Sequence, residues 1–156
     1  MKRRVLIADR YGQSDVLAIV EQDLGPLAAG HVRIAVRSAG VNPIDARRMT
    51  GEVKFGRLPL TFGTEFAGTI IDLPTGTERW SAGDEVLGAG GAFVTHATII
   101  DVPIGNLIRR PPSMDWSVSG SLAGVAQTAM AVLQELDGIK TLLVNGGAGG
   151  VGTVLI

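Results

Sequence analysis

The sequence predicts a mainly β fold that is followed by a short α/β part. Glycine accounts for 22 of the 156 residues, a proportion typical of many tight turns between the short strands of a small barrel. Several runs alternate apolar and polar residues with the period of two that a half-buried strand requires. After residue 112 the period becomes helical, and a glycine-rich turn then separates an apolar run from the start of another helix. Together these observations predict a barrel of strands, a linking helix and the first strand, turn and helix of an α/β unit.

The expected strands lie in the first two thirds of the chain. They cover residues 3–8, 16–22, 32–38, 64–73, 85–87 and 92–102. The run 32–38 is the clearest, since Val32, Ile34 and Val36 alternate with arginine and alanine. Glycine and proline separate the strands, for example at Gly25-Pro26. His96 falls in the last of these strands and is expected to be a packed or half-exposed side chain.

Two helices are expected before the glycine-rich turn. A short one runs from Ile44 to Met49, starts after Asn42-Pro43 and ends at Gly51. The second helix follows the sequence Arg-Pro-Pro at 110–112, where the character of the chain changes.

The second helix is capped by Ser113 or Asp115, has a break near Gly120 or Gly124, and ends at Asp137-Gly138. An apolar strand is expected next, at residues 141–145, before the glycine turn at 146–152. The chain is therefore divided into two domains, residues 1–112 and residues 113–156.

Composition and charge exclude several classes of function. Fourteen basic and fifteen acidic residues leave a net charge of −1, with no basic block for nucleic acid or an anionic membrane. The absence of cysteine excludes disulfides, thiolate nucleophiles and cysteine-bound zinc. No apolar run approaches the ~18 residues of a membrane span, and the apolar stretch 5–8 is too short for a signal peptide. A cytoplasmic location is therefore expected.

The glycine-rich turn predicts a dinucleotide site, because Gly147, Gly149 and Gly152 fit the pattern G-x-G-x-x-G. The first glycine is expected to allow the tight turn, the second to let the backbone approach a pyrophosphate, and the third to let the helix pack closely on the strand. Thr153 follows where a P-loop has lysine, which leaves a P-loop nucleotidase as a distant alternative. The expected cofactor-binding residues of the turn are Gly147, Ala148, Gly149, Gly150, Val151 and Gly152.

Four stretches, taken in order, resemble the medium-chain dehydrogenase/reductase superfamily on its zinc-free quinone oxidoreductase side. They are residues 39–45 (AGVNPID), 63–68 (GTEFAG), 83–86 (GDEV) and the turn 146–152. The resemblance covers nearly the whole chain. It implies a GroES-like catalytic domain at 1–112, and a linking helix with the start of a truncated Rossmann domain at 113–156. It also implies hydride transfer from NADP(H), with NAD(H) not excluded, to a small carbonyl, quinone or enone.

Zinc is not expected, and no other metal is. The zinc branch of the family carries Cys and His ligands, but Thr64 stands after Gly63 where a His would be. His31 and His96 are far apart in the sequence and have no partners at ligand spacing.

The resemblance implies three catalytic residues. Asn42 is expected to face the nicotinamide, although Asn-Pro also simply begins a turn before a helix. Asp45 either orients groups in the cleft or stabilises the first helical turn. Thr64 either donates a hydrogen bond near the reacting carbonyl or merely begins a strand.

Three further residues are relevant to the site and to the choice of substrate. Thr128 is expected at the nicotinamide end, or else bonds to the carbonyl four residues earlier in its helix. Glu65 resembles the family's structural acid and is expected to pair within the barrel. Arg47 stands where related quinone reductases often have Tyr, and this weakens the expectation of a quinone substrate.

Two functions from different classes are compatible with the sequence. One is the N-terminal part of an NAD(P)H-dependent oxidoreductase, inactive alone because the adenosine half of the cofactor site lies past the last residue. The other is a non-catalytic GroES-like module that acts through self-assembly or ligand binding. In either case the strand 141–145 lacks parallel neighbours, so we expect a homo-oligomer that covers this apolar edge. The expected partners are otherwise a small-molecule substrate, with no nucleic acid and no membrane.

Overall fold

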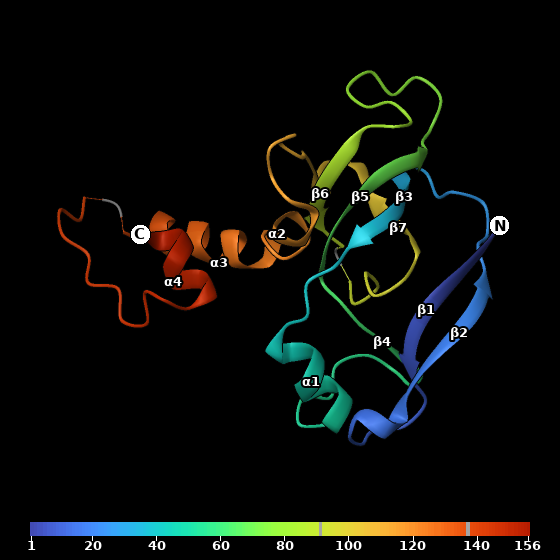
Figure 1. Cartoon of the computed structure of the whole chain (residues 1–156), viewed down its shortest axis with the longest axis horizontal. Coiled ribbons are helices and arrows are strands. Elements are labelled where there is room, and N and C mark those ends of the chain that lie inside the picture. The colour runs from blue at the N-terminus through green and yellow to red at the C-terminus, as the bar shows by residue number, and fades with distance from the viewer. Residues whose placement is uncertain (91, 137) are drawn as a thin grey trace.

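The computed structural model describes residues 1–90, 92–136 and 138–156, which form two antiparallel sheets and an arm of helices (Figure 1). In the smaller sheet β1 (Lys2–Ala8) lies between β2 (Leu17–Asp23) and β4 (Leu60–Thr61). The larger sheet has the order β7-β3-β5-β6-β8. Its strands are β3 (His31–Ser38), β5 (Glu65–Asp72), β6 (Glu85–Ala89), β7 (Ile99–Pro103) and β8 (Leu107–Arg109). Short 3₁₀ turns at Ser14–Val16 and Ile104–Asn106 precede β2 and β8.

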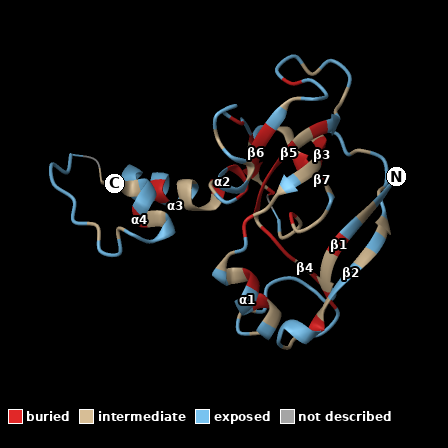
Figure 2. Ribbon diagram, in the orientation of Figure 1, coloured by how far each residue is buried: buried red, intermediate tan, exposed pale blue. Residues whose placement is uncertain are grey.

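The core of the larger sheet follows from the alternation of β3. Val32 and Ile34 are fully buried, and they pack with Phe66 of β5 and with Ile100 and Val102 of β7. Burial of these side chains is the main stabilising contribution to the domain. Figure 2 shows the buried residues concentrated in this sheet, whereas the helical arm is largely exposed.

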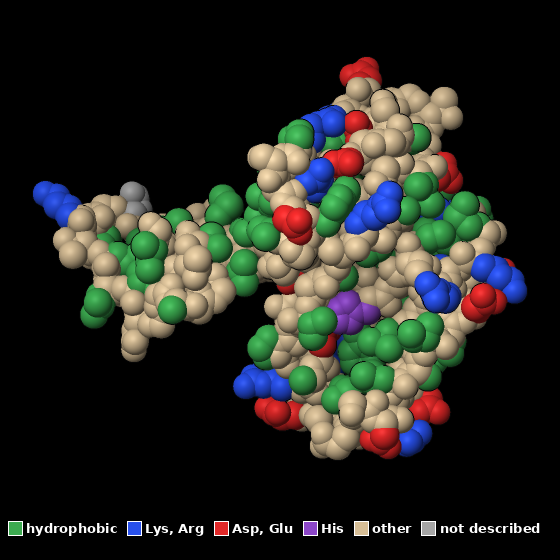
Figure 3. Space-filling view, viewed as in Figure 1, with side chains coloured by type: hydrophobic (Ala, Val, Ile, Leu, Met, Phe, Trp, Pro, Cys, Tyr) green, Lys and Arg blue, Asp and Glu red, His purple; other side chains and the backbone are tan. Residues whose placement is uncertain are grey.

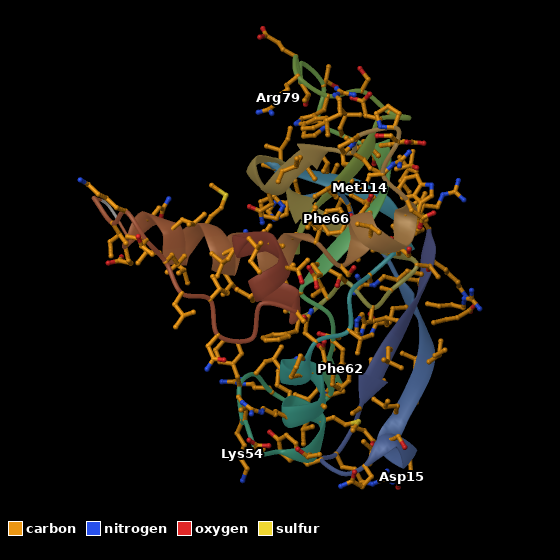
Figure 4. All side chains as sticks on the ribbon, turned by 60° about the vertical axis from the view of Figure 1, so that its left-hand side comes forward. Asp15, Lys54, Phe62, Phe66, Arg79 and Met114 are labelled. Carbon is orange, nitrogen blue, oxygen red and sulfur yellow. The ribbon has the colours of Figure 1, made fainter. Side chains whose placement is uncertain are left out.

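A second apolar cluster lies under the smaller sheet. Ala8, Val16, Leu60 and Phe62 form it, with Met49 of the first helix packed against them. Figure 4 shows Phe66 among the strands of the larger sheet and Phe62 beside the first helix.

Four helices are present in the described ranges. They are α1 (Pro43–Thr50), α2 (Trp116–Gly120), α3 (Ala123–Gln134) and α4 (Gly150–Leu155). Helix α1 ends at Gly51 in the left-handed conformation with φ 81°, as the sequence predicts. Asp115 caps α2 by accepting a hydrogen bond from Ser117 N at 2.8 Å, which confirms one of the two predicted caps. The end expected at Asp137-Gly138 involves Asp137, which lies outside the described residues.

Three expectations about the strands are wrong. The sheets do not close into a barrel in the described ranges, where one isolated bridge, Val5 to Ala97, joins them. The expected strand 92–102 forms a regular strand only from Ile99 onward, as β7. His96 is therefore not in a strand: its segment is irregular because Val94 N and Thr95 N bond to the carbonyl of Gly63.

The expected strand at 141–145 is also not formed in the described residues. Leu143 is 91% exposed, and a strand needs a neighbour whose backbone groups complete its hydrogen bonds.

The predicted fold class, mainly β with a helical continuation, is nevertheless confirmed. Of the helices in the described ranges, none has the length and apolar character that crossing a bilayer requires. The cytoplasmic location stays a prediction.

Candidate functional site

An open cleft of about 310 Å³ lies where the start of α1 faces α3 and α4. Asn42, Thr64, Thr128 and Val151 line it, although they come from four separate parts of the sequence. All four are residues that the sequence predicts for the site. The cleft is completed by Pro43, Ile44, Gly124 and Val125.

A smaller recess of about 200 Å³ shares Thr64 and Gly124 with this cleft. Its other lining residues include Phe93 and Gln127, which the sequence analysis did not single out. Gln127 lies next to Thr128 on α3, but nothing in the helical period distinguishes it. Phe93 lies in the irregular segment, so no strand pattern could place it.

Asn42 is fixed at the edge of the cleft by the start of α1. It occupies the N-cap position with extended backbone, and Pro43 follows at the first helical position. Its backbone N donates to Oδ2 of Asp45 at 2.9 Å, and its side-chain Nδ2 donates to Oε1 of Glu65 at 2.7 Å. Asn42 therefore both precedes the helix, as the Asn-Pro sequence predicts, and lines the cleft.

Asp45 lies behind the cleft and does not line it. Its second oxygen, Oδ1, accepts a hydrogen bond from Gly63 N at 2.9 Å, and the residue is only 6% exposed. Both carboxylate oxygens thus bind backbone N–H groups, one at the start of α1 and one in the turn before Thr64. This arrangement supports the neighbours of the cleft, and a catalytic role of Asp45 stays a prediction.

Thr64 is presented to the cleft by a turn at Gly63. Gly63 has φ 83°, a conformation that favours glycine, and a side chain there would also meet His96 at 2.5 to 2.8 Å. The Thr64 carbonyl accepts a hydrogen bond from Gly90 N at 2.7 Å. The backbone is therefore anchored on both sides of the Thr64 side chain.

Thr128 lines the cleft from α3. Its hydroxyl donates to the carbonyl of Gly124 at 2.9 Å, which is the local bond that the sequence analysis considered as the alternative. Since the proton of the hydroxyl is engaged, Oγ1 can offer only an acceptor to a ligand. The local bond and a role in the cleft are thus compatible.

The glycine turn packs α4 against α3. A side chain at Gly150 would meet Cγ1 of Val125 at 3.1 Å, and one at Gly152 would lie 2.7 Å from Cα of Gly147. Gly152 therefore lies against the backbone of its own turn, whereas the predicted packing of the helix on a strand is not observed because residues 141–145 form no strand. The left-handed residue of the turn is Gly146, with φ 81°. Ala148 is exposed on the turn, and Gly149 is the N-cap of α4.

Arg48 supports the wall of the smaller recess. Its guanidinium carbon lies 3.6 Å from the ring centroid of Phe93, and its Nη1 donates to the carbonyl of Thr61 at 2.7 Å. Burial lowers the pKa of the Arg48 guanidinium from its ordinary value, and the charge of Asp45 opposes that shift. No sequence pattern indicates this role, since an arginine in a short helix is typical of a surface position.

Residues 28–135 match the alcohol dehydrogenase GroES-like domain. The chain belongs to this family. The predicted resemblance to the medium-chain dehydrogenase/reductase superfamily is confirmed by this match and by the relatives that follow.

The human mitochondrial NAD(P)H oxidoreductase RTN4IP1 is 26% identical over 176 residues, which cover 96% of this chain and 44% of that protein. The chloroplastic NADPH-dependent alkenal/one oxidoreductase of Arabidopsis thaliana is 30% identical over 159 residues, covering 94% of this chain and 41% of that protein. The structure of the quinone oxidoreductase from Coxiella burnetii superposes with a TM-score of 0.88 at 24% identity, over 100% of this chain and 52% of that one.

This GroES-like chain therefore spans about half the length of the oxidoreductases that it matches. The likeness to the Coxiella structure establishes the fold, including the helical arm.

Proposed function

We propose that this chain forms the substrate- and nicotinamide-facing part of a zinc-free, NAD(P)H-dependent oxidoreductase. The observation that carries the proposal is the cleft in which Asn42, Thr64 and Thr128 meet Val151 of the glycine turn. Residues 1–112 would supply the catalytic domain, and residues 113–156 would supply the linking helix and the start of the cofactor domain. The names of the relatives support NADP(H) as the cofactor and a conjugated carbonyl or a quinone as the acceptor.

The glycine turn fits a dinucleotide. Its glycines let the start of α4 lie close to the backbone of the turn, since side chains at Gly149 and Gly152 would meet the backbone of Gly146 and Gly147. Backbone N–H groups at the start of α4, near Gly150 and Val151, would face a pyrophosphate. A bound nicotinamide cofactor would supply the hydride.

The residues of the cleft would orient the reacting groups. The Thr64 hydroxyl can donate a hydrogen bond to the oxygen of a carbonyl acceptor, and this bond would polarise that carbonyl. Thr128 Oγ1 can accept a hydrogen bond from an N–H or O–H group of the ligand. Asn42 adds a third polar side chain to the cleft, while Pro43, Ile44 and Val125 supply apolar surface.

We further propose that this chain alone is inactive and forms a homo-oligomer. Exposed apolar side chains support the second part, among them Leu143 at 91% and Ile156 at 85%. Figure 3 shows apolar side chains spread along the arm of α3 and α4. The same surface is what a non-catalytic module acting through self-assembly would use, so that alternative is retained.

The proposal is tested by calorimetric titration of the chain with NADPH, with NADH alongside. Saturable binding that the substitution Gly149→Val weakens is expected, because the new side chain would press on the Gly146 carbonyl at 3.2 Å. Equal heats for the wild type and the Gly149→Val variant would count against a cofactor role of the turn.

A further inference from the structure

The carboxylate of Glu65 is buried and joins two distant parts of the chain. Glu65 is 1% exposed, and Oε1 accepts from Nδ2 of Asn42 at 2.7 Å. Oε2 accepts from the backbone N of Gly124, in the first turn of α3, at 2.6 Å. Among the described residues, the ion pairs of the chain do not include Glu65.

These bonds form part of a longer chain of hydrogen bonds. The carbonyl of Gly124 accepts from Thr128 Oγ1 at 2.9 Å, so the connection runs from Asn42 through Glu65 and Gly124 to Thr128. Asn42 and Thr128 both line the cleft, and no segment of regular structure links them directly. Glu65 is therefore the point at which α1 and α3 are held relative to each other.

Two glycines make room for this carboxylate. A side chain at Gly40 would lie 2.7 Å from Cδ of Glu65 and overlap Oε1, and one at Gly124 would lie 3.2 Å from Oε2. The lack of a side chain at these two glycines leaves the room that the Glu65 oxygens need for their bonds to Asn42 and Gly124.

The chemistry of the two partners requires an acceptor at both oxygens. Nδ2 of Asn42 and the N–H of Gly124 are both donors, and an ionised carboxylate is the side chain that accepts at both of its ends. Glutamine of the same shape would turn its NH₂ group against one of the two donors. A buried carboxyl group is costly unless hydrogen bonds satisfy it, and the bonds from Asn42 and Gly124 do so at both oxygens.

We propose that Glu65 is a positioning residue that sets the spacing of Asn42 and Thr128 across the cleft. The identity of the ligand in the cleft rests on the proposed function, whereas the coupling of the two residues does not. The coupling can therefore be tested separately from the activity.

The first test is hydrogen exchange by NMR on the ¹⁵N-labelled chain. In the wild type, the side-chain amide of Asn42 and the backbone amide of Gly124 should exchange at least about tenfold more slowly than the side-chain amide of Asn145, which is exposed. In Glu65→Gln, one of these two protections should be lost, and the resonances of Thr128 should shift. Exchange of the Asn42 amide as fast as that of Asn145 overturns the proposal, and so does a folded Glu65→Gln variant with both protections intact.

A second pair of variants decides the matter if Glu65→Gln does not fold. Asn42→Ala removes one end of the connection and should shift the Gly124 and Thr128 signals through Glu65. Asn106→Ala is the matched control, since Asn106 Nδ2 bonds to the carbonyl of Ala89 at 3.1 Å, outside this connection. Shifts at Gly124 and Thr128 that are no larger in Asn42→Ala than in Asn106→Ala contradict the coupling.

The last test adds NADPH as the probe. If Glu65 positions the cleft, the Kd for NADPH should rise about tenfold in Glu65→Gln, the effect expected when a hydrogen bond to a charged group is lost. Equal Kd values for the two folded proteins overturn the positioning role. A wild type that does not bind NADPH instead refutes the proposed function, while the exchange data still decide the coupling.

Discussion

Oδ1 of Asp45 accepts a hydrogen bond from the backbone N of Gly63 at 2.9 Å, and this bond joins α1 to the turn that presents Thr64. The other oxygen of Asp45 holds the backbone N of Asn42. One buried carboxylate thus fixes the backbone next to two residues of the cleft. The same carboxylate stabilises the start of α1, as an acidic residue in the first helical turn does.

Replacement of Asp45 should therefore destabilise the fold. Asp45→Ala leaves two backbone N–H groups without an acceptor, and we expect a loss of about 2–4 kcal/mol in the free energy of unfolding. Urea denaturation measures this loss. Asp15→Ala is the control, because the Asp15 side chain is 72% exposed and should contribute less than about 1 kcal/mol. Similar midpoints for the two variants would show that the Asp45 bonds are not important for stability.

Substitution of Gly152 should disrupt the glycine turn. The side chain of Gly152→Val would overlap the backbone of Gly146 and Gly147. We expect α4 to be displaced from this turn, its packing on α3 to be lost as a consequence, and the free energy of unfolding to fall by about 1–3 kcal/mol. Loss of the NMR contacts between Gly150 and Val125 would report the separation. Gly105→Val has no atoms within 4 Å of the added Cβ and should leave these contacts unchanged. Retention of the contacts in Gly152→Val would mean that the turn is not close-packed.

Arg48 should not tolerate lysine. Arg48 is 3% exposed, and its guanidinium stacks on Phe93 and donates to the carbonyls of Thr61 and Phe55. A lysine ammonium lacks the planar group that makes these contacts together, so Arg48→Lys should lower the free energy of unfolding by about 1–3 kcal/mol. Arg47→Lys is the matched control, since the Arg47 side chain is 59% exposed. The stacking assignment fails if thermal melting shows the same stability for both variants.

The pH dependence of stability should include Asp84. The hydrogen bond from Arg109, together with that from Ser81 N, lowers the pKa of the Asp84 carboxyl from its ordinary value. A carboxyl whose pKa is lower in the folded chain stabilises the fold above its unfolded pKa of about 3.9, and this contribution is lost as the pH falls through the folded pKa. Arg109→Ala should move the pKa of Asp84 back toward its ordinary value in a ¹³C NMR titration. An unchanged Asp84 titration in that variant would exclude Arg109 as the principal cause.

The sequence predicts correctly the strands in which the side chains of both faces have defined partners, one face in the core and the other on the polar side. In β3, Val32 and Ile34 face the core while Arg33 on the other face pairs with Asp101 of β7 at 2.8 Å, so the alternation is complete. Strands β4 and β8 are two and three residues long, too short to show any period, and they were not predicted. Residues 92–98 and 141–145 are apolar runs whose pairing depends on distant segments, which a local pattern does not reveal.

In the candidate site, too, residues within local motifs are predicted, whereas contacts between distant residues are not. Asn42, Thr64 and Thr128 were predicted from ordered motifs that resemble a family, and one cleft contains all three. Glu65 was expected only to pair within the barrel. Its bonds to Asn42 and Gly124 join residues 23 and 59 positions away, and no spacing in the sequence indicates them.

The proposed function requires that this cleft receives the nicotinamide end of the cofactor. The most direct test is an NMR titration of the ¹⁵N-labelled chain with NADPH, up to concentrations on the order of 10 mM because a partial site binds weakly. We predict saturable shifts that are largest at Asn42, Thr64, Thr128 and Val151. Saturable shifts centred elsewhere, or none at the highest concentration, would contradict the account.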